Sequence, residues 1–248
     1  MKKYLFIILS VIIIITGLLI LFKPKSFEKD FYVLNESHFI LNDANNQLTV
    51  SYFTNDLNFK LVDENTSGFI YNEDETIKFM IEGIKESSSY TEKYKNQNYY
   101  GYEIKIDLPQ INDTFYLEKA YLKLTTKSIK YHLFIGEVLI IYEDEINYYK
   151  FSGLEGLKRE IGKLSQILVN INEIDNIDEI YLGPYQCDYF IYDDKLLVIN
   201  INEEIKYLLF ETTVKIVIDN NNYYLPYFKY FYDYELLKSG SFHKYLLN

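Results

Sequence analysis

The sequence predicts an all-β protein, an antiparallel β-sandwich arranged as two tandem Ig-like domains behind one N-terminal transmembrane helix. Three observations lead to this prediction. One apolar run near the N-terminus carries no charge. Many later segments are rich in β-branched and aromatic residues, and their apolar positions alternate with a period of two. Clusters of Asn, Asp, Gly and Ser separate these segments at short intervals, as in sandwich folds.

The N-terminal apolar run extends from Tyr4 to Phe22. Its 19 residues would reach roughly 28 Å as a helix, which matches the hydrocarbon core of a bilayer. Lys2 and Lys3 would also suit a cleaved signal peptide, but the run is too long and no pair of small residues stands at a cleavage site. We therefore expect residues 1–25 to be an uncleaved signal-anchor in contact with the lipid bilayer.

The positive charges on the two sides of this anchor are nearly balanced, so they do not decide its orientation by themselves. Lys2 and Lys3 precede the run, whereas Lys23, Lys25 and Lys29 follow it. A short N-terminal head is easily retained, and long domains are translocated largely regardless of their charge. The prediction is N-inside, with the bulk of the chain extracytoplasmic in the envelope of a bacterium. A cytoplasmic C-terminal part is the alternative.

The part beyond the anchor is strongly acidic. The chain has 25 basic and 36 acidic residues, and four lysines but no acid lie within the first 25 positions, which leaves 21 − 36 = −15 for the remainder. Phosphates would be repelled by such a surface, so nucleic acid is excluded as a partner. Cations or basic partners would be attracted instead.

The predicted strands cover most of the acidic part. In residues 47–53 the positions alternate between two faces, as in a half-buried strand. The cluster at 219–222 lies between two such segments and is expected to turn a hairpin. Further segments share this composition: 76–84, 99–108, 115–125, 130–142, 188–192, 196–201, 207–218 and 223–232.

One stretch resists this pattern near the middle of the chain. Leu154, Leu157, Ile161, Leu164 and Leu168 recur at spacings of three and four, typical of a helix face, although two interior glycines oppose a helix. We predict a short helix or irregular connector near 154–165 that gives way to a strand at 167–171. The expected domains are 26–145, a first β-sandwich, and 146–248, a second β-rich domain. A single larger sandwich is the alternative.

No motif in the acidic part indicates catalysis. The three histidines are too widely spaced for one strand or helix to present two metal ligands, and Cys187 lacks the signature of a nucleophile. We expect a non-enzymatic protein without a cofactor. The alternative is a membrane-tethered hydrolase that uses loop carboxylates. The acidic clusters suit solvated turns, and Asp175, Asp178 and Glu179 are the candidates if a cation binds.

The segment 223–234 has the most unusual composition, because both of its faces are aromatic. Tyrosines combine contact area with a polar tip and concentrate at interaction surfaces. Pro226 lacks an N–H and suggests an edge strand or a bulge. The alternative is that one face fills the core and the other forms a cross-strand ladder. The candidate binding residues are Tyr223, Tyr224, Tyr227, Phe228, Tyr230 and Tyr232.

These observations together predict a single-pass membrane-anchored protein whose extracytoplasmic β-domains act without catalysis. Its role would be that of a binding protein or a subunit of an envelope complex. The expected partner outside the cell is a protein, a peptide or a glycan.

Overall fold

A computed structural model describes residues 28–43, 46–127, 129–160, 163–172, 176–229 and 235–247. This part of the chain is all-β, with three sheets whose strands are mostly antiparallel, as predicted. It contains no helix that is long and apolar enough to cross a membrane. The predicted anchor at Tyr4–Phe22 lies outside the described residues.

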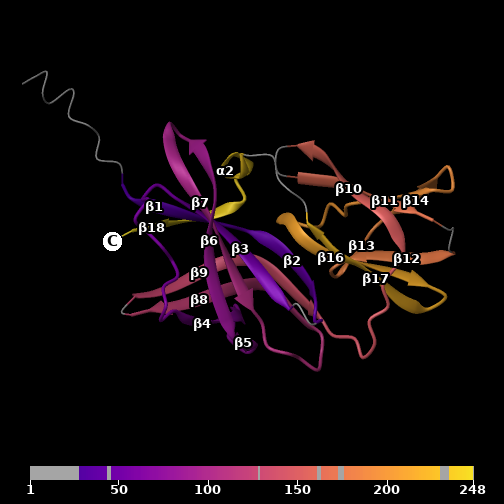
Figure 1. Ribbon diagram of the computed structural model, residues 1–248, viewed down its shortest axis with the longest axis horizontal. Helices are drawn as coiled ribbons and strands as arrows, with labels where there is room; N and C mark the ends of the chain where they lie inside the picture. The colour runs from indigo at the N-terminus through magenta and orange to yellow at the C-terminus, as the bar shows by residue number, and fades with distance from the viewer. Residues whose placement is uncertain are drawn as a thin grey trace, which may run out of the picture.

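The molecule has two halves that lie side by side along its long axis (Figure 1). The N-terminal half contains sheet A, and sheet B extends through both halves. Sheet A has the order β18 (Phe242–Leu246), β1 (Asp30–Leu34), β3 (Gln47–Thr54), β7 (Gln97–Asp107) and β6 (Gly83–Tyr94). Opposite it lie the following strands of sheet B: β2 (Glu36–Leu41), β9 (Ile129–Ile141), β8 (Phe115–Thr126), β4 (Ser67–Asn72) and β5 (Lys78–Met80).

The C-terminal half contains sheet C and the other end of sheet B. Sheet C has the order β10 (Phe151–Glu160), β11 (Lys163–Ile171), β15 (Leu196–Asn200) and β14 (Tyr189–Tyr192). The sheet B strands of this half are β13 (Tyr185–Gln186), β12 (Ile177–Leu182), β16 (Leu208–Ile218) and β17 (Asn221–Lys229). The predicted turn at 219–222 joins β16 to β17, where Asp219 and Asn220 have positive φ.

Sheet B is continuous because β2 pairs in parallel with both β16 and β9. Gly136 lies in the β2–β9 ladder at a φ of 109°, and a Cβ there would stand 2.1 Å from the carbonyl oxygen of Glu36. Only glycine permits this close approach. The parallel pairings join the two halves through the backbone.

Two clusters of buried side chains form the core. One lies within the N-terminal half and includes Val50, Ile104 and Val138. The other lies mainly in the C-terminal half but also includes Leu34 and Phe39. The second cluster thus contains residues from both halves, and it covers the faces of β1 and β2 that the first cluster does not.

The predicted helix or irregular connector near 154–165 is wrong, because β10 and β11 form a hairpin there. Leu157 pairs with Gln166 while Lys158 pairs with Leu164, so Ser165 is an extra residue in β11. Such a bulge reverses the alternation of side chains. It places Leu164 and Ile167, three residues apart, in the same core cluster. The leucines at helical spacing therefore do not share one face, since Leu164 is buried in the core whereas Leu157 is 37% exposed.

The last described segment packs on the N-terminal half. β18 pairs antiparallel with β1, and the short helix α2 (Leu236–Ser239) precedes it. The backbone N–H of Leu237 donates to both carboxylate oxygens of Glu92 on β6, at 3.1 and 3.3 Å. The predicted division into domains 26–145 and 146–248 stays a prediction. Residues 236–246 nevertheless contact the half that contains the first described strand.

Candidate interaction site

The described part of the predicted tyrosine-rich segment, residues 223–229, belongs to β17, which pairs with β16 at one border of sheet B. Four residues of β17, from Leu225 to Phe228, oppose the three residues from Thr212 to Val214, which shifts the register. This irregularity surrounds Pro226, where the sequence indicated an edge strand or a bulge. The other side of β17 is partly covered, because the N–H of Tyr224 donates to Asn147 O at 2.8 Å and Tyr149 N donates to Tyr224 O at 2.9 Å.

The predicted binding residues of this segment have different surroundings. Tyr224 is buried, with 1% of its surface exposed, and its hydroxyl donates to Glu143. Burial, followed by this hydrogen bond, raises the pKa of Tyr224 well above its usual range. Tyr223 is half-buried against the core of the C-terminal half. Tyr227 and Phe228 are described by their backbone alone, and Tyr230 and Tyr232 lie outside the described residues.

The candidate cation ligands do not form a group in the described part of the chain. Asp178 and Glu179 are consecutive residues of β12 at a shift of register with β16, and the residues on either side of them, Ile177 and Ile180, both belong to the core. The hydroxyl of Tyr181 donates to Glu179 at 2.6 Å. Asp175 lies outside the described residues. The described residues contain no group of three His, Cys, Asp or Glu side chains that could hold a metal ion. Cation binding at these residues stays a prediction.

A surface that the sequence analysis did not single out lies on the outer face of sheet C. Ile167 on β11, Leu197 on β15 and Ile191 on β14 point into the core. Their neighbours Leu168, Val198 and Phe190 therefore point outward, and the register places these three side by side across the strands. Phe190 is 49% exposed and Tyr192, next to it on the same face, is 60% exposed. Phe190 and Tyr192 thus present an aromatic patch to water on the outer face of sheet C, beside the buried Val198 and the hydrogen-bonded polar pair Gln166 and Asn200.

Strand β14 is also an edge of sheet C (Figure 1). It pairs with β15 in continuous register, and no described strand pairs with its other side. Natural edge strands are ordinarily protected by charges, prolines or bulges. The opposite edge, β10, has such protection in its register shifts and in Glu155 and Lys158. The sequence of β14, YFIY, has neither a charge nor a proline.

Three aspartates stand at the two ends of β14. Asp188 precedes the strand, and Asp193 and Asp194 form the turn that follows it, both with positive φ. Among the described ion pairs none includes these three carboxylates. The edge therefore has an aromatic centre between acidic ends. The sequence signal was the same one that drew attention to 223–234, namely aromatic residues on both faces of one strand.

A buried carboxylate connects the two halves of the molecule. Glu137 on β9 is 1% exposed and accepts hydrogen bonds from Ser37 Oγ at 2.5 Å and from Tyr116 OH at 2.8 Å. The hydroxyl of Tyr185, on β13 of the C-terminal half, donates to the same carboxylate at 3.0 Å. Burial raises the pKa of both tyrosines above the usual value, so both hydroxyls remain donors at neutral pH. These hydrogen bonds position the C-terminal half relative to the N-terminal one.

No protein-family model matches the chain, and no curated protein matches it. Among solved structures, the N-terminal periplasmic domain of ScsB from Proteus mirabilis is similar over 85% of this chain and 96% of that chain. The sequence identity is 10% and the TM-score is 0.26. A likeness at this TM-score does not establish a common fold or a common function.

Proposed function

We propose that the chain is a single-pass, membrane-anchored binding protein of the cell envelope whose two β-sandwich domains lie outside the cytoplasm. Its edge strand β14 captures an extended segment of another protein. The observation that carries this proposal is an edge strand in continuous register with β15, whose other side pairs with no described strand and which has two exposed aromatic side chains, Phe190 and Tyr192. Such an edge can accept the strand of a partner through main-chain hydrogen bonds.

The charges around β14 define the kind of segment that fits. A second copy of the chain would bring its own Asp188 or Asp193 next to these aspartates, and like charges directly opposite are unfavourable. A segment with apolar residues in its middle and lysine or arginine at its ends would place cations beside the acidic ends of β14. The overall net charge of −11 favours the approach of the same class of partner. The proposed partner is thus a basic-flanked extended peptide or protein segment.

The anchor and its orientation belong to the same proposal. The uncharged run Tyr4–Phe22 supports a spanning helix, and the short head before it supports an N-inside orientation. Protease treatment of intact cells tests the orientation. An epitope at the C-terminus should be removed from intact cells as fast as from permeabilised ones. A C-terminus that is protected until the membrane is opened contradicts the extracytoplasmic placement.

Binding at β14 can be tested with the full chain in detergent micelles. The probe is a fluorescent synthetic peptide in which alternating valine and threonine residues lie between lysines, and its anisotropy reports binding. The double substitution Phe190→Ser and Tyr192→Ser removes two exposed aromatic contacts and should weaken binding about tenfold or more, since such contacts contribute at least about 1 kcal/mol each.

Two controls make this test specific. The double substitution Met80→Ser and Tyr148→Ser removes side chains that are 63% and 48% exposed elsewhere, and it should leave the affinity within about twofold. A peptide with glutamates in place of the lysines should bind much more weakly than the lysine peptide. Equal binding of both peptides, or an equal loss in both double variants, would contradict the proposed site.

A further inference from the structure

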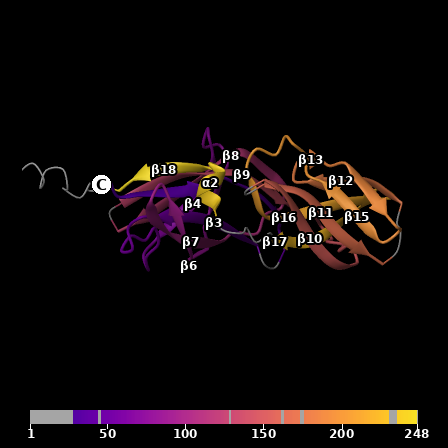
Figure 2. The same ribbon diagram turned by 90° about the horizontal axis from the view of Figure 1, so that it is seen from above.

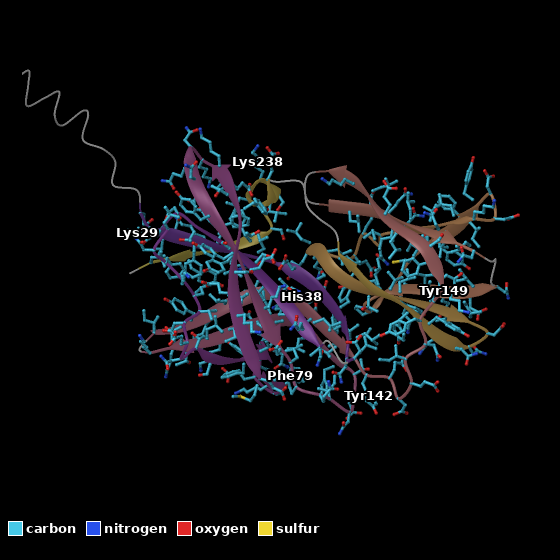
Figure 3. The ribbon with its side chains drawn as sticks, in the orientation of Figure 1. Lys29, His38, Phe79, Tyr142, Tyr149 and Lys238 are labelled. Atoms are coloured by element: carbon cyan, nitrogen blue, oxygen red, sulfur yellow. The ribbon has the colours of Figure 1, made fainter. Side chains whose placement is uncertain are left out.

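The first described residues, which follow the predicted anchor, lie at one end of the N-terminal half. In both Figure 1 and Figure 2 the first described residues, the C-terminus and the turn between β8 and β9 lie at this end. Lys29, labelled in Figure 3, pairs with Asp56 at 2.7 Å and so ties the loop 55–66 to the same end. Only six residue steps separate Phe22, the end of the predicted anchor, from Glu28. Six steps span at most about 21 Å, so this end must face a membrane that holds the anchor.

A groove of about 680 Å³ opens beside this end, between the loop 60–65, the start of β6 and the turn after β8. Its lining includes Lys60, Lys85 and Lys127, which are all exposed. Among the described ion pairs none includes these three ammonium groups. Three unpaired lysines around one groove are unexpected in a chain with a net charge of −11. They form a site at which phosphate groups could be bound.

The groove also contains Asp63, Glu64 and Glu86. Glu86 is directed to the protein, since its Oε1 accepts from Tyr52 OH at 2.6 Å and from Leu61 N at 3.1 Å. Asp63 accepts from Asn65 N at 2.9 Å within its own turn. Two of the three acids thus make hydrogen bonds to the protein, whereas the three lysines project to solvent. The end is close to neutral, in contrast to the acidic remainder of the molecule.

Exposed apolar side chains lie on the same end. Leu57, in the loop next to Asp56, is 60% exposed, and Ile129, two positions after Lys127, is 52% exposed. Leu246 of β18, which pairs with Asp30, is 54% exposed. Apolar side chains beside lysines are typical of surfaces that contact the boundary between headgroups and acyl chains.

We propose that this end of the N-terminal half docks on the surface of the membrane and that Lys60, Lys85 and Lys127 bind the phosphates of anionic phospholipids. This inference rests on the proposed anchor, which holds the end near the bilayer. Each lysine near an anionic surface favours the docked arrangement about fivefold, so three favour it about a hundredfold. The acidic remainder is repelled by the same surface, and the body therefore stands with its long axis directed away from the membrane.

The test uses the full chain in lipid nanodiscs with an environment-sensitive dye on an introduced cysteine, Asn58→Cys, next to Leu57. Cys187 is buried and burial raises its pKa, so the introduced thiol reacts selectively. Dye emission should be shifted to the blue and be about twofold stronger in discs with phosphatidylglycerol than in discs with phosphatidylcholine alone. High salt should abolish this difference.

The lysine variant is the triple substitution Lys60→Gln, Lys85→Gln and Lys127→Gln, in which the emission difference should be lost. The matched control changes three exposed lysines elsewhere, K93Q, K150Q and K195Q, with the same change of net charge, and it should retain the difference. Equal emission in both lipids, or an equal response of the two triple variants, would overturn the docking proposal. Failure of the chain to co-elute with the discs would instead refute the anchor, so the two failures are distinguishable.

Discussion

At the scale of single residues, the strands of the N-terminal half bury several ionisable groups. His38 on β2 is enclosed by this half (Figure 3), and its Nε2 lies 3.9 Å from Glu36 Oε2 without forming a hydrogen bond. Burial lowers the pKa of His38 from 6.5 to about 4, although a hydrogen bond with the backbone of Ile135 opposes this shift. The imidazole is therefore neutral in the folded protein at neutral pH.

His38 should make the stability of the protein depend on pH. Between pH 6.5 and about 4 the unfolded chain binds a proton at this residue that the folded chain does not. The free energy of unfolding should therefore decrease as the pH falls through this window, by at most about 3 kcal/mol from this group. Denaturant titrations at several pH values measure the slope.

The substitution His38→Gln removes this titration and keeps a polar side chain. Carboxylates also titrate in the lower part of the window, so the comparison concerns the difference in slope between the two proteins rather than the stability of either. A variant whose stability changes with pH as steeply as that of the parent protein would show that His38 is protonated equally in both states.

At the scale of elements, the last segment of the chain depends on one carboxylate. Glu92 is 4% exposed on β6 and accepts the N–H of Leu237 in the first turn of α2. Burial raises the pKa of Glu92, and hydrogen bonds from the backbone of α2 oppose this shift. Helix α2 leads into β18, which pairs with β1 along its whole length. Glu92 therefore positions the segment that completes sheet A.

Replacing Glu92 by alanine should release this segment. The buried N–H of Leu237 would lose its acceptor, and we expect the free energy of unfolding to decrease by about 1–3 kcal/mol. Amides of β18 should exchange faster with deuterium, and mass spectrometry of the C-terminal peptide measures this. Glu118→Ala, at an exposed position, is the control and should change the stability by less than about 0.5 kcal/mol. Unchanged exchange in β18 would show that its pairing with β1 alone holds the segment.

At the scale of the whole molecule, the two halves have common elements. Sheet B passes through both, one core cluster includes residues of both, and Glu137 accepts hydrogen bonds from both. At Gly183 a Cβ would stand 2.5 Å from the ring of Phe39, so the C-terminal half approaches β2 closely. Contacts of this extent should make the two halves unfold together, whereas two domains joined only by a flexible linker would unfold independently.

We expect a single calorimetric transition, with equal calorimetric and van't Hoff enthalpies. Leu197→Ala, at a fully buried position of β15, should destabilise the protein by about 2–5 kcal/mol and shift the whole transition to lower temperature. The transition should remain undivided. Two transitions, with only one of them moved by this substitution, would indicate that domains 26–145 and 146–248 unfold independently.

The sequence predicted the features that depend on neighbouring residues. Alternation with a period of two predicted segments that form β3, β7, β8, β9, β15 and β16, and the cluster at 219–222 predicted a hairpin. Strands with polar or weakly alternating sequences, such as β6 and β12, were not predicted. Their own residues give no clear strand pattern, and only their pairing with β7 and β16 in the structure shows that they are strands. For the site, the sequence placed 188–192 in a strand but did not show that this strand is an edge.

What the sequence determined by itself is the all-β class, the acidic surface and the prediction of an anchor, because composition and local periodicity are properties of adjacent residues. The tertiary structure decided the remainder. It made a bulged hairpin of 151–171, paired β18 with β1, joined the halves through β2 and left one side of β14 without a partner among the described strands. These features depend on which distant strands meet, and a strand's own residues do not specify its partner.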